Sequence, residues 1–273
     1  MEKVIAVIVT YNRIKLLKEC LNAVLSQTYK VHKIVLIDNA STDGTADLFI
    51  KGGEYDKDVI DYRRMETNLG GAGGFYEGIK ICRDMECDYV WIMDDDTIPY
   101  TDCLEKLMSA RSKIEGKIGY LASSIIGPDS EPMNVPAIDM RPAKNGYPHW
   151  YKYLSEGIVQ ISRATFVSIL IPYDAIKKCG LPCKDYFIWG DDSEYTMRIS
   201  KYYAPAYFVG ASVALHKRFN AKKLVIHNFK VALQKLLKGD FIRAKVIFLG
   251  TLDSITQRKK FEEYIANELS LQK

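Results

Sequence analysis

The first 94 residues alternate short apolar runs with longer amphipathic segments, and this alternation constrains the fold more than any other feature of the sequence. The apolar runs are rich in β-branched residues and lie at Ile5–Val9, Ile34–Ile37, Val59–Tyr62 and Tyr89–Met93. Runs that are apolar on both faces are typical of parallel strands covered by helices on both sides. The intervening segments have apolar residues at helical spacing and lie at Ile14–Leu25, Gly44–Ile50 and Gly73–Arg83. The pattern predicts an open α/β sheet, Rossmann-like and mostly parallel, with helices on both faces.

The pattern changes after Pro99. We expect helices at Asp102–Ile114 and Ser193–Tyr202, and strands at Gly119–Ile126, Val167–Ile171 and Tyr207–Leu215. Residues 127–157 contain five prolines and no regular pattern, and a loop of this length is typically functional. The sequence turns helical again from Ala221 to its end. We therefore predict an α/β domain at 1–216 and a basic helical C-terminal extension at 217–273.

Charge is distributed unevenly between these two parts. Residues 1–216 contain 25 Lys and Arg against 29 Asp and Glu, whereas residues 217–260 contain 12 against 2. A basic segment with an interleaved apolar stripe favours an anionic partner, and an anionic membrane surface is the partner that we expect. A solvated helix pair with charged outer faces accounts for the same composition equally well. We expect no nucleic acid as a partner.

Two features bear on the cellular compartment. The apolar run Val4–Val9 is too short for the core of a signal peptide, and no segment has 18 uninterrupted apolar residues. The six cysteines include no Cys-x-x-Cys pair, so a zinc ribbon is not indicated and buried thiols of a reducing compartment are expected. These features predict a cytoplasmic protein, which would be peripheral on the inner face of the cell membrane if the basic segment binds lipid.

Three consecutive aspartates, Asp94, Asp95 and Asp96, directly follow the apolar run Tyr89–Met93. Three like charges at the carboxyl end of a buried strand cost free energy unless a cation gathers them. In an open α/β sheet, this edge is also where ligands bind. Asp94 and Asp96 point to the same side in extended geometry, so both could hold one ion. We predict a divalent metal site here rather than a polar loop that caps a helix.

The first two predicted strands also end in polar clusters, at Thr10–Arg13 and at Asp38–Gly44. Both clusters fall on the edge of the sheet that holds the aspartates. Asp38 could hydrogen-bond the edge of a base, and Thr10 and Arg13 could hold a base or a phosphate. Ser41 is expected to cap a helix, as Ser commonly does.

A glycine-rich segment, Asn68–Phe75, lies between a predicted strand and a predicted helix. Glycine lets the backbone approach a ligand closely, and a helix N-terminus favours negative charge. The segment matches neither Gly-x-Gly-x-x-Gly nor Gly-x-x-x-x-Gly-Lys, so a nicotinamide or ATP site is not indicated. Tight turns use glycine as well, so this segment alone indicates little.

Two adjacent acids, Asp191 and Asp192, precede the last predicted helix of the α/β domain. A carboxylate beside a sugar donor is what is needed to take the proton of an attacking hydroxyl group. Trp189 offers a flat face for a sugar ring, and a core tryptophan is an equally good interpretation. His216 ends the last predicted strand, where an imidazole suits an ion of the Mn²⁺ type better than Mg²⁺. A single histidine is otherwise more often structural.

Taken in order, these elements resemble glycosyltransferase family 2, whose members are inverting enzymes with the GT-A fold. The resemblance covers roughly residues 3–216 and rests on Thr10–Arg13, Asp38–Gly44, Asn68 with its glycines, the aspartate triplet and Asp191–Asp192. Within the family, the chain is most similar to bacterial galactofuranosyltransferases, which use UDP-galactofuranose, and this likeness adds Trp189 and His216. Gly190 separates Trp189 from the paired acids here, whereas those enzymes place Trp directly before them. The chain is also much shorter than the polymerising members of that group.

The resemblance implies a hexosyltransferase of bacterial surface polysaccharide synthesis, with a nucleotide-diphosphate sugar as donor and a glycan or lipid-linked glycan as acceptor. It implies that Asp94, Asp96 and His216 bind a divalent metal, Mn²⁺ or Mg²⁺, with Asp192 as catalytic base. Donor binding is expected from Thr10, Tyr11, Asn12, Arg13, Asp38, Asn39, Asn68, Gly71, Gly73, Asp94 and Asp95. Acceptor binding is expected from Asp191, Trp189, His149 and Trp150. The alternatives are a rhamnosyltransferase that uses dTDP-rhamnose, a nucleotidyltransferase and a non-catalytic sugar-nucleotide-binding protein.

Overall fold

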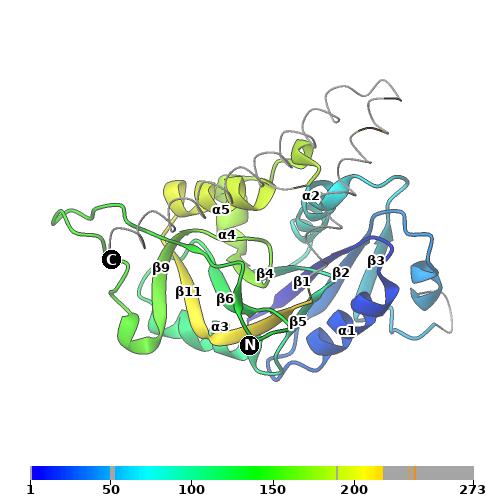
Figure 1. The fold of residues 1–273 in the computed structure, drawn as a ribbon, viewed down its shortest axis with the longest axis horizontal. Helices are drawn as coiled ribbons and strands as arrows, with labels where there is room; N and C mark the ends of the chain where they lie inside the picture. The colour runs from blue at the N-terminus through cyan, green and yellow to red at the C-terminus, as the bar shows by residue number, and fades with distance from the viewer. Residues whose placement is uncertain (1, 50–52, 189, 218–232, 234–236, 238–273) are drawn as a thin grey trace, which may run out of the picture. The chain divides into compact units, whose positions relative to one another are not determined.

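The computed structural model describes residues 2–49, 53–188 and 190–217, together with Leu233 and Leu237. The described residues up to 217 form one compact unit, which is coloured in Figure 1. Its α-helices are α1 (Ile14–Leu25), α2 (Gly70–Cys82), α3 (Cys103–Lys113), α4 (Tyr173–Cys179) and α5 (Asp191–Tyr202). Its strands are β1 (Val4–Thr10), β2 (Lys33–Asp38), β3 (Ile60–Arg64), β4 (Tyr89–Asp94), β5 (Thr97–Pro99), β6 (Leu121–Ile126), β7 (Pro132–Met133), β8 (Ala137–Ile138), β9 (Ile158–Arg163), β10 (Ile169–Pro172) and β11 (Ala206–His216). Short 3₁₀ helices are η1 (Thr45–Phe49), η2 (Leu154–Glu156) and η3 (Lys184–Tyr186).

The strands join one mixed sheet in the order β3-β2-β1-β4-β10-β6-β11-β9-β8, with β5 paired to β11 and β7 paired to β6. Strands β3, β2, β1, β4, β6 and β11 run in one direction, and β10 and β9 run the opposite way. The predicted mostly parallel α/β sheet is therefore confirmed. The chain passes outward from β1 to β2 and β3, and then returns to β4 on the other side of β1. Such a reversal opens a crevice at the carboxyl ends of the strands.

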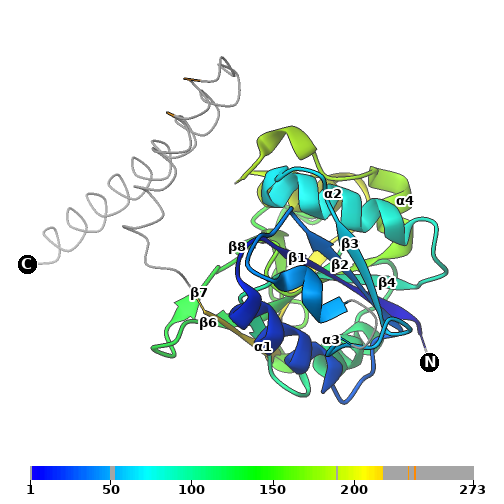
Figure 2. The same ribbon diagram turned by 90° about the vertical axis from the view of Figure 1, so that its right-hand side faces the viewer.

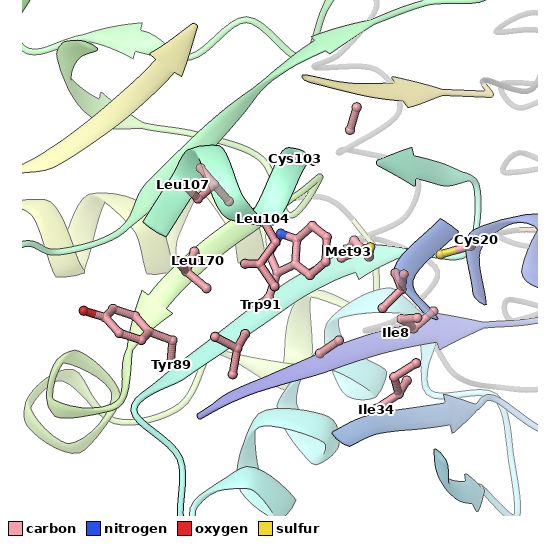
Figure 3. Close-up of a cluster of buried hydrophobic side chains, with 14 of the residues drawn as sticks. Ile8, Cys20, Ile34, Tyr89, Trp91, Met93, Cys103, Leu104, Leu107 and Leu170 are labelled. Carbon is pink, nitrogen blue, oxygen red and sulfur yellow. The ribbon is translucent and has the colours of Figure 1, made fainter. Parts of the chain in front are cut away.

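Each face of the sheet is covered by its own helices, as Figures 1 and 2 show. Helices α1 and α3 pack on one face, where Figure 3 shows Trp91 of β4 beside Leu104 and Leu107 of α3. Helices α2, α4 and α5 pack on the other face, against Val90 and Ile92 of the same strand. Alternating side chains of β4 thus enter two different cores, so the strand is buried on both faces.

Helix α2 lies close to the sheet because two of its glycines face β1. A Cβ atom on Gly78 would stand 2.4 Å from Cγ1 of Val7, and one on Gly74 would stand 2.5 Å from Cγ1 of Val9. A larger residue at either position would force the helix outward or deform a close-packed core. Helix packing therefore accounts for part of the glycine-rich sequence.

Strand β11 changes its neighbour part-way along its length. Residues 206–209 pair with β9 and residues 214–216 pair with β5, while β6 pairs with both parts. Residues 210–212 form a bulge between them, because the partner strand advances only from Ser123 to Ser124 over the same interval. The bulge re-aims the end of β11 toward β5, which directly follows the aspartate triplet.

The elements predicted before residue 127 are present, with ends that differ by up to three residues. The helix predicted at Gly44–Ile50 is wrong in type, because its described part forms the short 3₁₀ helix η1. Residues 127–157 are irregular as predicted, apart from β7, β8 and η2. Strand β9 and helix α4 were not predicted. The helices predicted in the extension at 217–273 lie outside the described residues, apart from Lys217, Leu233 and Leu237.

Candidate active site

Strands β1, β2 and β4 end at one edge of the sheet and bring their polar ends together. Thr10 at the end of β1 is in register with Asp38 at the end of β2. Val9 of β1 is in register with Asp94 at the end of β4. Because the three strands are parallel neighbours at the reversal of strand order, this edge is where a ligand is expected to bind. The two polar clusters and the aspartate triplet therefore share a rim, as the sequence predicted.

The aspartate triplet is held by groups from β1 and from the loop that follows it. Oγ1 of Thr10 donates a hydrogen bond to Oδ2 of Asp95 at 2.7 Å. The guanidinium of Arg13 bridges two acids, with Nη1 3.2 Å from Oδ1 of Asp95 and 2.9 Å from Oδ2 of Asp96. Asp95 and Asp96 are buried, so their charges would be costly without this cation.

His216 of β11 reaches the triplet from the second half of the sheet. Its Nε2 lies 3.1 Å from Oδ1 of Asp96, and its Nδ1 lies 2.8 Å from Oδ1 of Asn134. The amide oxygen accepts a hydrogen bond from Nδ1–H, which leaves the Nε2 lone pair of a neutral imidazole facing a carboxylate oxygen. Two lone pairs at this distance fit a shared cation, which is a proton on the ring or a metal ion between the two groups. Asn134 was missed by the sequence analysis.

The triplet contains more negative charge than its neighbours neutralise. Burial and the charges of Asp96 and Asp95 raise the pKa of Asp94 well above its ordinary value. Burial, partly opposed by Arg13, raises the pKa of Asp95 to about 6. Within the described ranges, no three acidic, His or Cys side chains are already arranged around one point as a metal site. The excess charge and the mixed carboxylate and imidazole donors nevertheless fit Mn²⁺ or Mg²⁺.

Asp191 and Asp192 begin α5 and occupy different environments. Burial and the charge of Asp192 raise the pKa of Asp191 to about 7, and the charge of Asp191 in turn acts on Asp94. Burial also raises the pKa of Asp192, although its Oδ1 accepts a hydrogen bond from the N–H of Ser193 at 2.5 Å. Gly190 has a φ of +100°, a conformation that favours glycine and turns the chain into α5. A carboxyl group with a pKa near 7 can accept a proton at neutral pH.

Asp38 is fully buried, and both of its carboxylate oxygens have partners. Oδ2 accepts a hydrogen bond from the hydroxyl group of Tyr62 at 2.6 Å, and Oδ1 accepts one from the N–H of Ser41 at 2.8 Å. Nε of Arg64 lies 3.9 Å from Oδ2. Tyr62 and Arg64 were missed by the sequence analysis, although their place at the end of the strand beside Asp38 was a usable signal.

The loops after β1 and β2 are joined by side-chain hydrogen bonds. The N–H of Asn12 donates to Oγ of Ser41 at 2.9 Å, and the N–H of Thr42 donates to Oδ1 of Asn12 at 2.7 Å. Oδ2 of Asp43 accepts from the N–H of Ile14, the first residue of α1, at 2.9 Å. The cap of α1 thus comes from Asp43, and Ser41 connects two loops instead of capping a helix.

Two further residues of this rim differ in exposure. Tyr11 is exposed to solvent beside the loops just described. Asn39 is buried, and its Nδ2 donates a hydrogen bond to the carbonyl of Gly70 at 3.0 Å. Among the described residues, Oδ1 of Asn39 has no hydrogen-bond partner. Such an acceptor is typical of a site that holds water or a ligand.

The glycine-rich segment forms the N-terminus of α2. Oδ1 of Asn68 accepts from the N–H of Gly70, whose φ is +74°. A Cβ atom on Gly70 would stand 1.9 Å from the carbonyl oxygen of Phe187, and one on Gly73 would stand 2.4 Å from the side chain that precedes the helix. A Cβ atom on Gly71 would meet nothing within 4 Å. Of the two glycines predicted to bind the donor, Gly71 therefore borders open space and Gly73 has a packing role.

The structure does not bring the predicted acceptor residues together as it does the polar residues at the strand ends. Trp189 lies outside the described residues. The carbonyl of Trp150 accepts from the N–H of Gln160 at 3.0 Å, and its ring packs edge-to-face on Tyr151. Across the described part of the chain, no hydrogen bond or ion pair joins His149 or Trp150 to the acids of the rim. Their place in an acceptor site stays a prediction.

Residues 5–125 match the protein-family model described as glycosyl transferase family 2. The match spans β1 to β6 and includes the polar rim and the aspartate triplet. The resemblance to glycosyl transferase family 2 is therefore confirmed over these residues. Asp191, Asp192 and His216 lie beyond the matched residues, so their roles stay predictions.

Two curated relatives match part of this chain. Galactofuranosyltransferase GlfT1 of Mycolicibacterium smegmatis is 37% identical over 109 residues, which are 40% of this chain and 35% of the relative. Abequosyltransferase RfbV of Salmonella typhimurium is 34% identical over 103 residues, which are 37% of this chain and 30% of the relative. The matched regions thus span about a third of the length of these relatives.

Two solved structures share the fold at low sequence identity. The crystal structure of GalNAc-T7 with UDP, GalNAc and Mn²⁺ has a TM-score of 0.63 and 18% identity over 81% of this chain and 45% of that chain. The crystal structure of S. aureus TarS 1–349 in complex with UDP has a TM-score of 0.59 and 16% identity over 90% of this chain and 70% of that chain. The predicted GT-A fold is therefore confirmed. None of the described helices combines the length and the apolar character that crossing a membrane requires.

Proposed function

We propose that this chain is a glycosyltransferase that moves a sugar from a nucleotide-diphosphate donor to a hydroxyl group of a glycan or lipid-linked glycan. The observation that carries the proposal is the buried aspartate triplet at the end of β4, to which the charge of Asp191 at the start of α5 adds by raising the pKa of Asp94. The triplet stands at the strand ends, where nucleotides bind in sheets of this order. The start of α5 would supply the carboxylate that a displacement at a sugar carbon needs. The family 2 match over residues 5–125 supports the part of the proposal that concerns the sugar donor.

The donor would bind along the carboxyl ends of β1, β2 and β4. Open space at Gly71 and the N–H groups of the first turn of α2 favour a phosphate there. The exposed ring of Tyr11 would contact the nucleoside. Arg13 would add positive charge beside the diphosphate.

A divalent metal, Mn²⁺ or Mg²⁺, would be held by Asp94, Asp96 and His216. When bound, it would neutralise the charge that develops on the leaving diphosphate. Asn134 would keep the Nε2 lone pair of His216 directed at the ion by accepting a hydrogen bond from Nδ1–H. The excess negative charge of the buried triplet supports this assignment.

The proposed reaction is one inverting displacement. The acceptor oxygen bonds to the anomeric carbon, the bond from that carbon to the diphosphate breaks, and a carboxylate takes the proton of the hydroxyl group. Following the resemblance, we assign the base to Asp192 and the positioning of the acceptor to Asp191. Asp191 is the second candidate for the base, because its pKa of about 7 suits proton transfer at neutral pH.

For the sugar, we propose galactofuranose from UDP-galactofuranose, which the similarity to GlfT1 supports. The similarity to abequosyltransferase RfbV, at nearly the same identity and coverage, keeps other donors open. A dTDP-rhamnose donor is the alternative.

The test is to incubate the full chain with a panel of nucleotide sugars and to measure the nucleoside diphosphate released, with and without Mn²⁺. We expect the greatest release from UDP-galactofuranose, and a loss of release in an Asp96→Asn variant. Binding of a nucleotide sugar without any release would favour a non-catalytic binding protein. Release of pyrophosphate from a nucleoside triphosphate and a sugar phosphate would favour a nucleotidyltransferase.

For the acceptor, we propose that residues 217–260 bind an anionic membrane surface and bring the site to a lipid-linked glycan. The lysines Lys222, Lys223, Lys230, Lys235 and Lys238 alternate with apolar residues in this segment. Each lysine near an anionic leaflet contributes about 1 kcal/mol at modest salt. Sedimentation with liposomes tests the proposal. Equal binding to neutral and anionic vesicles, at low and at high salt, would contradict it.

A further inference from the structure

A continuous chain of hydrogen bonds crosses the core on the α3 side of the sheet. Nε1 of Trp91 donates to Oγ of Ser168 at 3.1 Å, Oγ of Ser168 lies 2.7 Å from Oγ of Ser123, and Oγ of Ser123 lies 2.8 Å from Oγ of Ser212. The hydroxyl group of Ser212 ends the chain by donating to the carbonyl oxygen of Cys103 at 2.9 Å. Trp91 and Cys103, the two end residues of this path, are labelled in Figure 3 among their apolar neighbours. All three serines are buried.

The direction of every hydrogen bond in this chain follows from its two ends. The indole N–H of Trp91 can only donate and the carbonyl of Cys103 can only accept, so each serine accepts from one neighbour and donates to the next. Each hydroxyl group is therefore satisfied, and chains of this kind strengthen one another in a medium of low polarity. A hydroxyl group left without its partner in such a core costs about 1–3 kcal/mol.

The chain ends on the part of β11 that departs from regular pairing. Ser212 is the last residue of the bulge at 210–212, and Ser123 is the β6 residue at which the bulge begins. After the bulge, β11 leaves β9, pairs with β5 and places His216 opposite Thr97. Because side chains alternate along a strand, a slip of one residue at the bulge would turn His216 to the other face and away from Asp96.

We propose that the serines Ser168, Ser123 and Ser212 form a positioning network that fixes the bulge of β11 and so holds His216 against Asp96. The three serines touch neither the rim nor its acids, so they act through β11. The consequence for metal binding rests on the proposed function, whereas the placement of His216 does not.

The first test measures the placement of His216 directly, by the rate at which diethyl pyrocarbonate modifies it, read by peptide mass spectrometry in the full chain. Both ring nitrogens of His216 are engaged in the parent, so the rate should be low. In Ser212→Ala we expect the rate to rise about tenfold, the population change that loss of one buried hydrogen bond produces. The exposed His149 serves as the internal reference.

A matched control separates positioning from a general loss of stability. Ser200 is also buried, and its hydroxyl group donates to the carbonyl of Ser162 at 2.7 Å, on the opposite side of the sheet. Ser200→Ala should leave the reactivity of His216 unchanged. Ser123→Ala keeps the hydrogen bond from Ser212 to the carbonyl of Cys103, so it should raise the reactivity of His216 less than Ser212→Ala does. It replaces Ser212→Ala in this test if that variant does not fold.

The second test measures the affinity for Mn²⁺ by electron paramagnetic resonance of the free ion. Ser212→Ala should weaken binding by about 10–100-fold, as losses of outer partners of metal ligands do. In a His216→Ala background, the same substitution should have no further effect, because the network acts through His216. An equal effect in both backgrounds would overturn the proposal, and so would a His216 reactivity within twofold of the parent in both serine variants. If the serine substitutions raise the reactivity of His216 but the parent binds no Mn²⁺ and releases no nucleotide, the positioning stands and the proposed function is overturned.

Discussion

In residues 4–94, each strand is parallel to its neighbour and each polar site residue stands at or just after the end of a strand. In residues 97–216, β10 and β9 run against their neighbours and β11 contains a bulge of three residues. The site residues of this second part come from the first turn of a helix and from the end of the bulged strand. The family 2 match covers the first part and ends within β6, before Asp191 and His216.

This difference shows how two kinds of local structure build one site. In the first part, the topology of the sheet alone gathers the polar residues, because parallel strands end together. In the second part, special devices are needed, namely the turn at Gly190, the bulge of β11 and the contact of Asn134 with His216. We therefore expect proton transfer to depend on the second part, metal binding to depend on both parts, and the packing of α2 to depend on the first part.

The largest expected effect belongs to the paired acids. Asp192→Asn keeps the shape of the side chain but removes the basic oxygen, so turnover should fall by about 10²–10⁴-fold with donor affinity little changed. Asp191→Asn should mainly weaken the use of the acceptor. Donor affinity and turnover should be measured for both variants, with Asp174→Asn, an exposed acid in the first turn of α4, as the control.

Turnover of Asp192→Asn within a few-fold of the parent would show that the base lies elsewhere. Asp191 would then be the first candidate. Glu194 would be the second, although both of its carboxylate oxygens lie 2.8 Å from nitrogens of Arg198.

Metal dependence should show the next largest effect, and it connects the two parts of the sheet. Excess chelator should abolish turnover. Asp96→Ala should weaken Mn²⁺ binding more than His216→Ala, for which a loss of about 10–100-fold is expected, because a carboxylate supplies charge as well as a ligand. Calorimetric titration with Mn²⁺ measures both affinities, and full turnover in chelator would exclude the metal altogether.

Asp191 should also limit stability at neutral pH. Its pKa is raised from 3.8 to about 7 in the folded protein, so the folded state binds an extra proton between these values. The stability that the protonated carboxyl group provides is present at low pH and is lost as pH rises from about 4 to above 7. Asp191→Asn should therefore raise the free energy of unfolding at pH 8 by on the order of 2–4 kcal/mol, and by less at pH 5.

Thermal unfolding of the parent and of Asp191→Asn at the two pH values measures this difference. Asp174→Asn should show no comparable gain at pH 8. A gain in Asp191→Asn that is the same at pH 5 and pH 8 would mean that burial of the charge is not the cause.

The smallest expected effect lies in the first part, at the contact of α2 with β1. Gly78→Ala places a methyl group against Val7 and should lower the free energy of unfolding by about 1–3 kcal/mol. Gly71→Ala, with open space around the new methyl group, should be neutral or stabilising by up to about 1 kcal/mol. Chemical denaturation measures both, and equal effects at the two glycines would contradict the close packing of α2.

The sequence predicted the first part of the site well for a physical reason. An apolar run that ends in polar residues marks a strand end, so the sequence pattern alone places Thr10, Asp38 and the aspartate triplet on one rim. Asn134 could not be recognised in this way, because its role depends on a contact across the fold. Asn134 meets His216 from 82 residues away in the chain.

The glycine-rich segment shows a second limit of sequence reasoning. Gly71 and Gly73 look alike in the sequence, yet one borders open space and the other packs against the side chain before the helix. The sequence did not indicate the bulge of β11 either. Gly210, Ala211 and Ser212, which form the bulge, lie within a run that was predicted as one continuous strand. Positions of this kind follow from packing across the fold rather than from local pattern.

The interior position of β11 also affects how the protein is made. Although β11 is the last strand described, it lies between β6 and β9. Chains emerge from the ribosome N-terminus first, so β1 to β4, β10 and β6 can pair while residues 206–216 are still being synthesised. Until then, one edge of β6 is open and can pair with another nascent chain. When β11 pairs with β6, it closes this open edge. The same step brings His216 to the site.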